Sequence, residues 1–409
     1  MVKRELYLKQ MQEWREKQVI KVVTGVRRCG KSTLFQQYID FLLSDGVHHE
    51  QIVYINLEDL AFEGLLDYRK LYSYIEKRLI TGKTTYVLLD EVQQCPRFEK
   101  AVDSLYIKEN VDLYITGSNA NLLSGELATL LSGRYVLIEM LPLSFKEFVA
   151  SGNGTASMRE QFNRYLRFGS FPYLTQLDES ESTFRTYIEG IYSTILLKDV
   201  ASREGIADVS LLEDIIRFLS SSIGSPVSAK RISDAINASG RSISVNTVDK
   251  YLKALTESFI FYKADRFDVK GRNLLKTLAK YYIVDTGLRN YLLPAMSQDL
   301  GHQIENIVYL ELLRRDFRVN VGKVGDKEVD FVASGKNQIV YFQVATTVLA
   351  EETLKRELDA FNGIPDNFPR MLLTLDDIPA YANHNGVHQV YLLDWLLEKN
   401  RNIYDLGGD

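Results

Sequence analysis

Residues 20–33 read IKVVTGVRRCGKST, and this stretch decides the fold. Its β-branched start predicts a buried strand, and the residues from Lys31 onward have helical periodicity. Gly25 and Gly30 allow the tight turn that brings backbone N–H groups against phosphate oxygens. The helix that follows directs the positive end of its dipole at the same place. The pattern G-x-x-x-x-G-K-[ST] between a strand and a helix therefore predicts a phosphate-binding loop, or P-loop.

The residue types in this loop suit a nucleotide with a metal ion. Lys31 can reach the β- and γ-phosphates, and the Ser32 hydroxyl can bind Mg²⁺. Arg27 and Arg28 could contact phosphate or a partner, but a solvated loop explains them equally well. We expect ATP and Mg²⁺ as ligands, and the expected nucleotide contacts are Gly25, Arg27, Arg28, Cys29, Gly30, Lys31, Ser32 and Thr33.

Further apolar runs alternate with helical patterns along the first third of the chain. They lie at 52–56, 85–90, 112–117 and 134–140. Strands that alternate with helices indicate βαβ units and a parallel sheet.

Polar residues at the strand ends complete the expected site. Asp90 ends the run TYVLLD and should hold Mg²⁺ through water, and Glu91 should polarise the attacking water, which points to hydrolysis rather than passive binding. Asn119 could orient the same water, or it could cap the next helix. Arg134 precedes the last strand. It could be offered to the γ-phosphate of a neighbouring subunit, or it could be an ordinary ion-paired arginine.

Composition excludes several classes of protein. Hydrophobic residues make up 45% of the 409 residues and charged residues 25%, which excludes a mainly disordered chain, a collagen-like chain and a coiled coil. Cys29 and Cys95 are the two cysteines, too few for a disulfide framework or a four-cysteine zinc site. The N-terminus is too charged for a signal peptide, and no apolar run is long enough for a membrane helix. We expect a cytoplasmic protein that does not bind membranes.

The middle of the chain has the pattern of a winged helix. Helical periodicity at 211–224, 228–237 and 244–258 is followed by strand-like runs at 259–267 and 280–285, with a basic segment between these two runs. In a winged helix the third helix enters the DNA major groove. A winged helix that binds protein is the alternative.

The charge of this region favours DNA. Residues 227–290 contain 12 Lys or Arg against 6 Asp or Glu, although the whole chain has a net charge of −5. Such a contrast is typical of a surface that contacts phosphates. The expected contacts are Arg241, Lys250, Lys253, Lys270, Arg272 and Lys276.

The C-terminal part has the pattern of a PD-(D/E)XK nuclease. An amphipathic helix at 301–315, three strand-like runs at 318–323, 327–334 and 338–345 and a further helix from Glu351 to about Phe361 follow one another. The chemistry needs acidic residues for Mg²⁺ and a lysine that activates water. Glu305, Asp330 and Gln343 occupy the first three places, and Ala345 stands where the lysine should be. We therefore expect a degenerate nuclease site without cleavage activity.

Six segments together resemble a known family. They are GVRRCGKST (25–33), LLDEVQ (88–93), ITGSNA (115–120), ELATLLSGRY (126–135), LPLSFKEF (141–148) and FGSFPYL (168–174) with the later LLKD. The chain closely resembles bacterial and archaeal AAA ATPases that carry a C-terminal domain of unknown function with a nuclease-like fold. The resemblance covers essentially the whole chain. It implies an α/β fold with an AAA core of strand order 5-1-4-3-2, and the roles given above for Lys31, Ser32, Asp90, Glu91 and Asn119.

We expect four parts: an AAA P-loop core over 1–145, a helical lid and linker over 146–205, a winged helix over 206–295 and a nuclease-like α/β domain over 296–409. The expected function is ATP binding and hydrolysis coupled to DNA. The alternative is a nucleotide-switched regulator that holds a protein partner, hydrolyses ATP slowly and does not contact DNA. A functional Arg134 would require a homo-oligomer.

Overall fold

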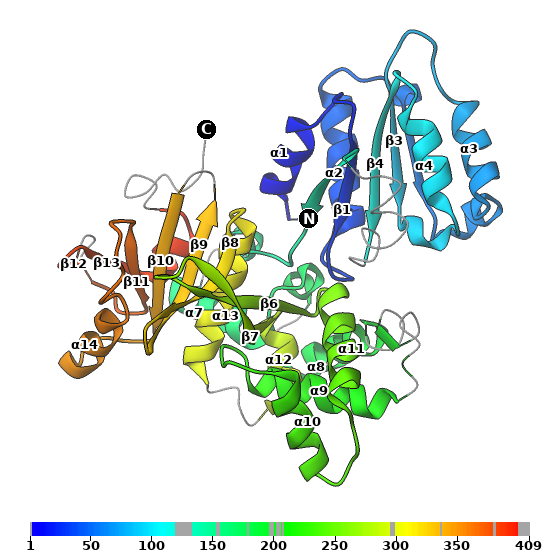
Figure 1. Cartoon of the computed structure of the whole chain (residues 1–409). Coiled ribbons are helices and arrows are strands. Elements are labelled where there is room, and N and C mark those ends of the chain that lie inside the picture. The colour runs from blue at the N-terminus through cyan, green and yellow to red at the C-terminus, as the bar shows by residue number, and fades with distance from the viewer. Residues whose placement is uncertain are drawn as a thin grey trace. The chain divides into compact units, whose positions relative to one another are not determined.

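The structure is a computed structural model, and its described residues are 2–118, 133–152, 156–177, 180–195, 200–201, 206, 208–294, 299–335, 338–378 and 382–399. The side chains of Lys276 and Thr277 lie outside that description. The chain forms two compact units (Figure 1). Unit 1 is Met1–Pro142 with Glu257–Phe259, and unit 2 is Leu143–Thr256 with Ile260–Asp409.

Unit 1 contains a parallel sheet with helices on both faces (Figure 1). Its strands are β1 (Ile20–Thr24), β2 (Ile52–Asn56), β3 (Thr85–Asp90), β4 (Val111–Gly117) and β5 (Tyr135–Glu139). Its helices are α1 (Glu5–Glu13), α2 (Lys31–Ser44), α3 (Tyr68–Glu76) and α4 (Phe98–Tyr106). The strand order β2-β3-β4-β1-β5 is the predicted order 5-1-4-3-2 read from the other edge, so this prediction is confirmed.

The side chains of β1 point alternately to the two faces of the sheet, and helices cover both faces (Figure 1). Ile20 and Val22 belong to the apolar cluster that includes residues of α3 and α4. Lys21, between them, lies over the ring of Tyr114, and that ring packs against Tyr38 of α2. Since successive side chains of a strand point to opposite faces, an apolar strand of this kind requires a layer of helices on each side.

Unit 2 combines helices with a mixed sheet. The helices are α6 (Phe145–Ser151), α7 (Met158–Phe168), α8 (Glu181–Thr194), α9 (Val209–Ser221), α10 (Ala229–Ala238), α11 (Val245–Glu257), α12 (Thr286–Leu292), α13 (Leu300–Arg314), α14 (Glu351–Asp359) and α15 (Leu392–Leu396). The strands are β6 (Phe261–Asp268), β7 (Asn273–Ile283), β8 (Arg318–Val324), β9 (Lys327–Gly335), β10 (Gln338–Ala345), β11 (Arg370–Thr374), β12 (Ala382–His384) and β13 (Val387–Tyr391). They form one sheet with the order β12-β13-β11-β10-β9-β8-β6-β7.

The hairpin β6–β7 differs from its sequence-based expectation in two respects. The basic segment that we expected between the strands is mostly strand, because a shift in register at Asp265/Arg266 lets the pairing continue to Asp268↔Asn273. The hairpin also pairs with β8, from Arg266↔Val321 to Asp268↔Lys323. The expected winged-helix and nuclease-like parts therefore share one sheet.

Helix α13 is buried on all sides rather than amphipathic as expected. Every residue from Gln303 to Leu312 is buried. Two carboxylates tolerate this position because each has a cation partner: Glu305 lies 3.0 Å from Lys280, and Glu311 lies 2.5 Å from Arg314.

A buried carboxylate joins the GSF turn after α7 to the start of α12. Asp285 accepts hydrogen bonds from the backbone N–H of Ser170 (2.6 Å), the Ser170 hydroxyl (2.8 Å) and the N–H of Leu288 (2.8 Å). A Cβ on Gly169 would lie 2.2 Å from Asp285 Oδ1, and one on Gly287 would lie 2.2 Å from the carbonyl oxygen of Phe168. Both glycines therefore allow a contact that no larger residue permits.

Among the described residues, no helix is both long and apolar enough to cross a bilayer.

Candidate nucleotide site

The P-loop lies between β1 and α2, as the sequence predicts. Gly25 has φ +143° and Gly30, which directly precedes α2, has φ +104°. A Cβ on Gly25 would lie 2.1 Å from the carbonyl oxygen of Met140. The first glycine of the motif is thus required by packing as well as by the turn.

Lys31 is folded over its own loop. Its Nζ donates hydrogen bonds to the carbonyl oxygens of Gly25 (3.1 Å) and Val26 (3.3 Å) and lies 3.9 Å from Glu91 Oε1. The side chain is buried. Because its acceptors are mainly neutral carbonyls, an anion in the loop would be a stronger partner for this ammonium group.

Asp90 lies at the carboxyl end of β3 and is fully buried. Tyr54 donates a hydrogen bond to its Oδ2 at 3.1 Å, and the Thr116 hydroxyl donates to its Oδ1. Burial raises the pKa of Asp90, and hydrogen bonds from the Ser32 and Thr116 hydroxyls oppose that rise. Ser32 and Asp90, the two expected Mg²⁺ ligands, are therefore brought together by the fold.

Glu91 is held beside Asp90 in an unusual backbone conformation. Its φ is +53°, its N–H donates to the Thr116 hydroxyl at 2.9 Å, and its carboxylate accepts a hydrogen bond from the Gln93 amide. The sequence reasoning missed Tyr54, Thr116 and Gln93. The signal for Tyr54 and Thr116 was their position on β2 and β4, the strands that flank β3.

Two buried hydroxyls lie at the same edge of the sheet. Thr24 Oγ1 and Ser118 Oγ have no hydrogen-bond partner among the described residues. Thr24 pairs in register with Gly117, the neighbour of Ser118, so both hydroxyls belong to the end of the sheet that carries the P-loop. Buried polar groups are nearly always satisfied, so this edge fits a polar ligand.

The remaining expected nucleotide contacts are placed as follows. Arg27 lies 3.2 Å from Glu58, Arg28 is exposed with φ +66°, and Thr33 is half-buried on α2. Cys29 is fully buried, and burial raises the pKa of its thiol. Asn119 lies outside the described residues.

Arg134 lies at the opposite end of the sheet from the P-loop. It directly precedes the five residues of β5, a strand that pairs with β1 from Ile20↔Tyr135 to Thr24↔Glu139. At about 3.3 Å per residue, this strand separates Arg134 from the P-loop edge by roughly 16 Å. Its guanidinium lies 2.5 Å from Asp103 and 5.5 Å from the centre of the Tyr106 ring. Arg134 therefore does not reach the nucleotide site of its own chain.

The expected DNA contacts fall into different environments. Arg241 is ion-paired with Asp214 at 3.1 Å and donates to the Ser210 hydroxyl at 2.6 Å. Lys250 and Lys253 are exposed on α11. Lys270 and Arg272 are exposed in the turn between β6 and β7, and the side chain of Lys276 lies outside the described part.

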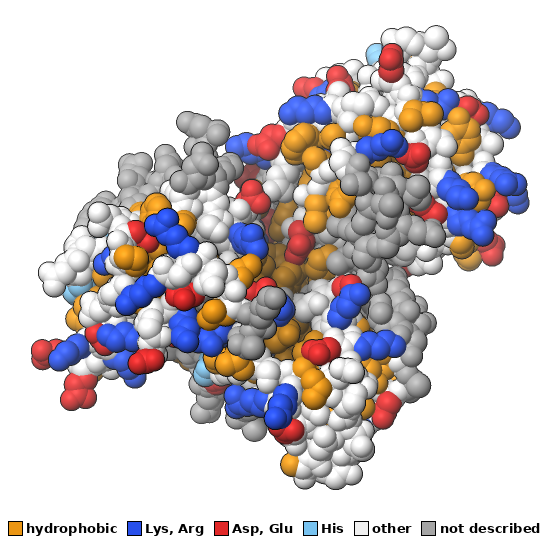
Figure 2. Space-filling view, in the orientation of Figure 1, with side chains coloured by type: hydrophobic (Ala, Val, Ile, Leu, Met, Phe, Trp, Pro, Cys, Tyr) orange, Lys and Arg blue, Asp and Glu red, His pale blue; other side chains and the backbone are white. Residues whose placement is uncertain are grey.

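The positive charge of residues 227–290 is partly internal. Lys280 is buried against Glu305 and Glu328, and Arg289 is buried 3.0 Å from Asp299. Lys280, Arg289 and Arg241 are thus three of the twelve cations, and each is paired with a carboxylate that lies outside residues 227–290. In Figure 2, basic and acidic side chains are interspersed over the described residues of the visible face. Composition overstated the basic surface, because it cannot distinguish a buried ion pair from an exposed cation.

The expected nuclease-like residues do come together. Glu305 accepts hydrogen bonds from Lys280 (3.0 Å) and Tyr282 (2.7 Å). The Asp330 carboxylate accepts from the N–H of Val344 at 2.9 Å, and the N–H of Asp330 donates to Gln343 Oε1 at 3.2 Å. Burial and the nearby Glu305 raise the pKa of Asp330, while Lys280 lowers it.

The sequence pattern missed two members of this cluster. Lys280 comes from β7, whereas the sequence pattern places the nuclease lysine on β10, much later in the chain. Lys280 also lies 2.9 Å from Glu328. Glu357 of α14 accepts from the Gln343 amide at 2.9 Å. No group of three His, Cys, Asp or Glu among the described residues is arranged to hold a metal ion. Mg²⁺ at a P-loop does not need such a cage, because it retains waters and binds substrate phosphates.

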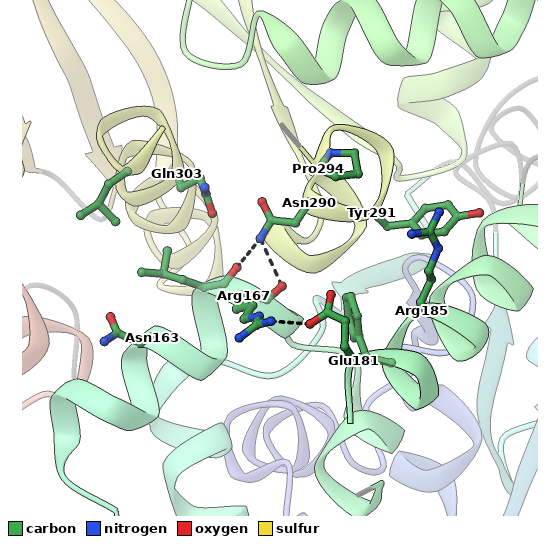
Figure 3. A pocket seen from close by; sticks show the side chains of 11 residues that line it. Asn163, Arg167, Glu181, Arg185, Asn290, Tyr291, Pro294 and Gln303 are labelled. Carbon is green, nitrogen blue, oxygen red and sulfur yellow. Dashed lines mark hydrogen bonds and ion pairs between the residues drawn. The ribbon is translucent and has the colours of Figure 1, made fainter. Parts of the chain in front are cut away.

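A separate cavity of about 570 Å³ lies within unit 2, among α7, α8, α12 and the start of α13 (Figure 3). Asn290 donates from its amide to the carbonyls of Leu166 and Arg167, and Arg167 is paired with Glu181 at 2.5 Å (Figure 3). The Asn290 amide nitrogen, Arg167 and Glu181 thus have protein partners, and the cavity contains none of the expected site residues.

Comparison with known proteins agrees with this geometry. Residues 17–149 match a family model described as an AAA domain, and residues 159–299 match one described as a domain of unknown function (DUF8612). An uncharacterized protein of Haemophilus influenzae is 39% identical over 402 residues, 97% of this chain and 99% of that one. An uncharacterized protein of Methanocaldococcus jannaschii is 30% identical over 360 residues, 84% of this chain and 78% of that one.

Among solved structures, the Walker-type ATPase PABY2304 of Pyrococcus abyssi is similar, with a TM-score of 0.51 at 16% identity over 71% of this chain and 96% of that one. This likeness concerns the fold, and the P-loop and parallel sheet described above agree with it. The chain therefore belongs to one family with the Haemophilus influenzae protein, and in it an AAA domain of P-loop ATPase fold precedes a domain of unknown function.

Proposed function

We propose that this protein binds ATP with Mg²⁺ at the P-loop edge of unit 1 and hydrolyses it. The observation that carries the proposal is the buried edge itself. There Lys31, Asp90 and Glu91 lie together, and the hydroxyls of Thr24 and Ser118 lack partners among the described residues.

Each group has a defined task in this proposal. Lys31 exchanges its loop carbonyls for phosphate oxygens. Ser32 and Asp90 would hold the metal ion, which would supply positive charge to the phosphate oxygens when bound. Glu91, held by Gln93, accepts the proton of the attacking water. Asn119 orients that water, and Arg134 acts on the nucleotide of a neighbouring subunit.

Binding of a fluorescent ATP analogue with Mg²⁺ tests the first step. Lys31→Ala removes the charged partner of the phosphates, so affinity should fall by about tenfold to a hundredfold. Lys83→Ala removes an exposed lysine of the same unit and should bind like the wild type. Equal affinity of the Lys31→Ala protein and the wild type would exclude the P-loop as the binding site.

In unit 2 we propose a winged helix joined to a nuclease-like sheet. The order of elements supports the winged helix: α9, a bridge between Val227 and Ala279, then α10, α11 and the hairpin β6–β7. The order α13, β8–β9, β10, α14 supports the nuclease-like part. In its acidic cluster the Lys280 ammonium is paired with both Glu305 and Glu328 and lies where a nuclease would have a metal ion, so we propose a structural cluster without cleavage.

We propose that α11 contacts DNA through its exposed face. Lys250 and Asn246 support this proposal because both are exposed there. The internal pairing of Arg241, Lys280 and Arg289 favours the second candidate, a nucleotide-switched regulator that binds protein through the same face.

Duplex DNA binding at several salt concentrations distinguishes the two candidates. If Lys250 contacts phosphate, Lys250→Glu should weaken binding and reduce the slope of log affinity against log salt by about one. Lys355→Glu reverses an exposed charge on α14 and serves as the matched control. No salt-dependent binding by the wild type, or equal losses in the two variants, would leave the protein-binding regulator as the function.

A further inference from the structure

Arg4 is a buried cation that reaches the P-loop from the N-terminal end of α1. The residue is 2% exposed. Its Nη1 donates to the carbonyl oxygen of Cys29 at 2.8 Å, and its Nη2 donates to those of Leu141 at 2.7 Å and Pro142 at 3.4 Å. One side chain thus joins the phosphate-binding loop to the segment where the chain leaves unit 1 for unit 2.

Further contacts fix the position of this guanidinium. The N–H of Arg4 donates to Gln37 Oε1 on α2 at 3.0 Å, and the guanidinium carbon lies 4.9 Å from the centre of the Tyr7 ring. The Tyr7 hydroxyl accepts a hydrogen bond from the N–H of Leu141 at 3.0 Å. A buried cation is costly to leave unsatisfied, so these contacts hold Arg4 in one arrangement.

The Cys29 carbonyl has particular importance for a phosphate loop. It belongs to the same planar peptide group as the N–H of Gly30, and in a trans peptide the two bonds point in opposite directions. By holding the carbonyl, Arg4 fixes the direction of the Gly30 N–H, one of the expected phosphate donors. A loop peptide that turns toward a ligand must also move Arg4, or lose its hydrogen bond.

The segment beyond Pro142 is fixed within unit 2. The N–H of Leu143 donates to the carbonyl of Ser170 at 2.8 Å, and the Tyr165 hydroxyl donates to the carbonyl of Leu143 at 2.9 Å. Ser170 is held by Asp285, as described above. A displacement of Leu141 and Pro142 would therefore reach unit 2 through a residue that is firmly attached to it.

We propose that Arg4 is a positioning residue of the nucleotide site that links the conformation of the P-loop to the segment leading into unit 2. The inference rests on the proposed nucleotide binding. It assigns to Arg4 two tasks: orienting a loop donor, and transmitting occupancy of the loop to residues 140–143.

Hydrogen–deuterium exchange of the full chain tests the link, with and without Mg²⁺ and a non-hydrolysable ATP analogue. The wild type should become protected in two places, the P-loop and residues 140–143. Arg4→Gln removes the two-armed contact, so the P-loop should still respond while the response at 140–143 is lost. Its affinity for the analogue should fall by about tenfold, the loss expected for a hydrogen-bonded charge.

Two further variants complete the design. Arg4→Lys keeps the charge and is the more conservative change should Arg4→Gln not fold. A single ammonium group cannot replace the two nitrogens of the planar guanidinium that contact Cys29 and Leu141, so this variant too should lose the response at 140–143. Lys3→Gln changes an exposed neighbour and should behave like the wild type.

The outcomes separate this inference from the proposed function. If residues 140–143 respond equally in the wild type and in both Arg4 variants, or respond in none of them while the P-loop does, the link is wrong and nucleotide binding stands. If the wild-type P-loop itself does not respond, nucleotide binding fails, and the inference fails with it.

Discussion

At the scale of single residues, two buried lysines are bonded to protein groups, one in each unit. Lys31 is satisfied by carbonyls of its own loop in unit 1, and Lys280 is satisfied by Glu305 and Glu328 in unit 2. The two lysines differ in what they offer. Lys31 has weak neutral acceptors that an anion can replace, whereas Lys280 has carboxylates that already neutralise it.

The cluster in unit 2 predicts opposite effects for two neutralising substitutions. The pKa of Asp330 is well above its ordinary 3.8, chiefly because of burial and then because of Glu305. The folded state therefore binds a proton that the unfolded state releases, and stability falls as pH rises above 3.8. Asp330→Asn should raise the free energy of unfolding at neutral pH by about 1 kcal/mol.

Glu305→Gln is the contrasting variant. It removes one of the two carboxylates that pair with Lys280, together with the acceptor of the Tyr282 hydroxyl, so it should lower the free energy of unfolding by about 2 kcal/mol. Denaturant unfolding at neutral pH, and again near the ordinary pKa of an aspartate, measures both effects. If Asp330→Asn destabilises as much as Glu305→Gln does, ionisation of the buried Asp330 does not lower the stability of the folded state.

The sequence identified the residues that local spacing controls and missed those that the fold brings in from elsewhere. Gly25, Lys31, Asp90 and Glu91 belong to short motifs at strand ends, and the structure places them together. Arg4 gave no signal, because nothing in a charged N-terminal helix marks one arginine as buried.

At the scale of elements, periodicity predicted the strands of unit 1 because each is a short apolar run between helices. Periodicity could not predict which strands far apart in the sequence would pair. The hairpin β6–β7 joins β8, and β11 to β13 extend the same sheet; these contacts depend on register rather than on local pattern. Helix α13 was wrongly expected to be amphipathic, because ion pairs allow its charged residues to be buried.

The turn between α7 and η5 (Pro172–Gln176) makes an element-scale prediction. In Gly169→Ala the new methyl would lie 2.2 Å from Asp285 Oδ1, and φ is +86°. The substitution should lower the free energy of unfolding by about 3 kcal/mol. Gly190→Ala is the matched control, because nothing lies within 4 Å of a Cβ there. It sits inside α8, where alanine should raise stability by about 1 kcal/mol.

Thermal unfolding of the two glycine variants compares them directly. A Gly169→Ala protein that melts with the wild type would show that the contact between Gly169 and Asp285 does not hold the turn in place.

At the scale of the whole molecule, unit 1 has the expected AAA core, and Leu143 at the start of unit 2 is bonded to the turn that Asp285 holds. In our account, ATP acts on the P-loop, Arg4 transmits its presence to Leu141 and Pro142, and Leu143 delivers it to unit 2. Unit 2 would present α11 to its partner in a nucleotide-dependent way. Each step rests on the first, that the P-loop edge binds and hydrolyses ATP.

The most direct test of that first step is the rate of phosphate release from ATP with Mg²⁺. It compares the wild type, Glu91→Gln and the control Glu63→Gln, which changes an exposed carboxylate of the same unit. We expect turnover by the wild type and the control, and a loss of about a hundredfold or more in Glu91→Gln with unchanged ATP affinity. Undiminished turnover in Glu91→Gln, or no turnover by the wild type, would contradict the account.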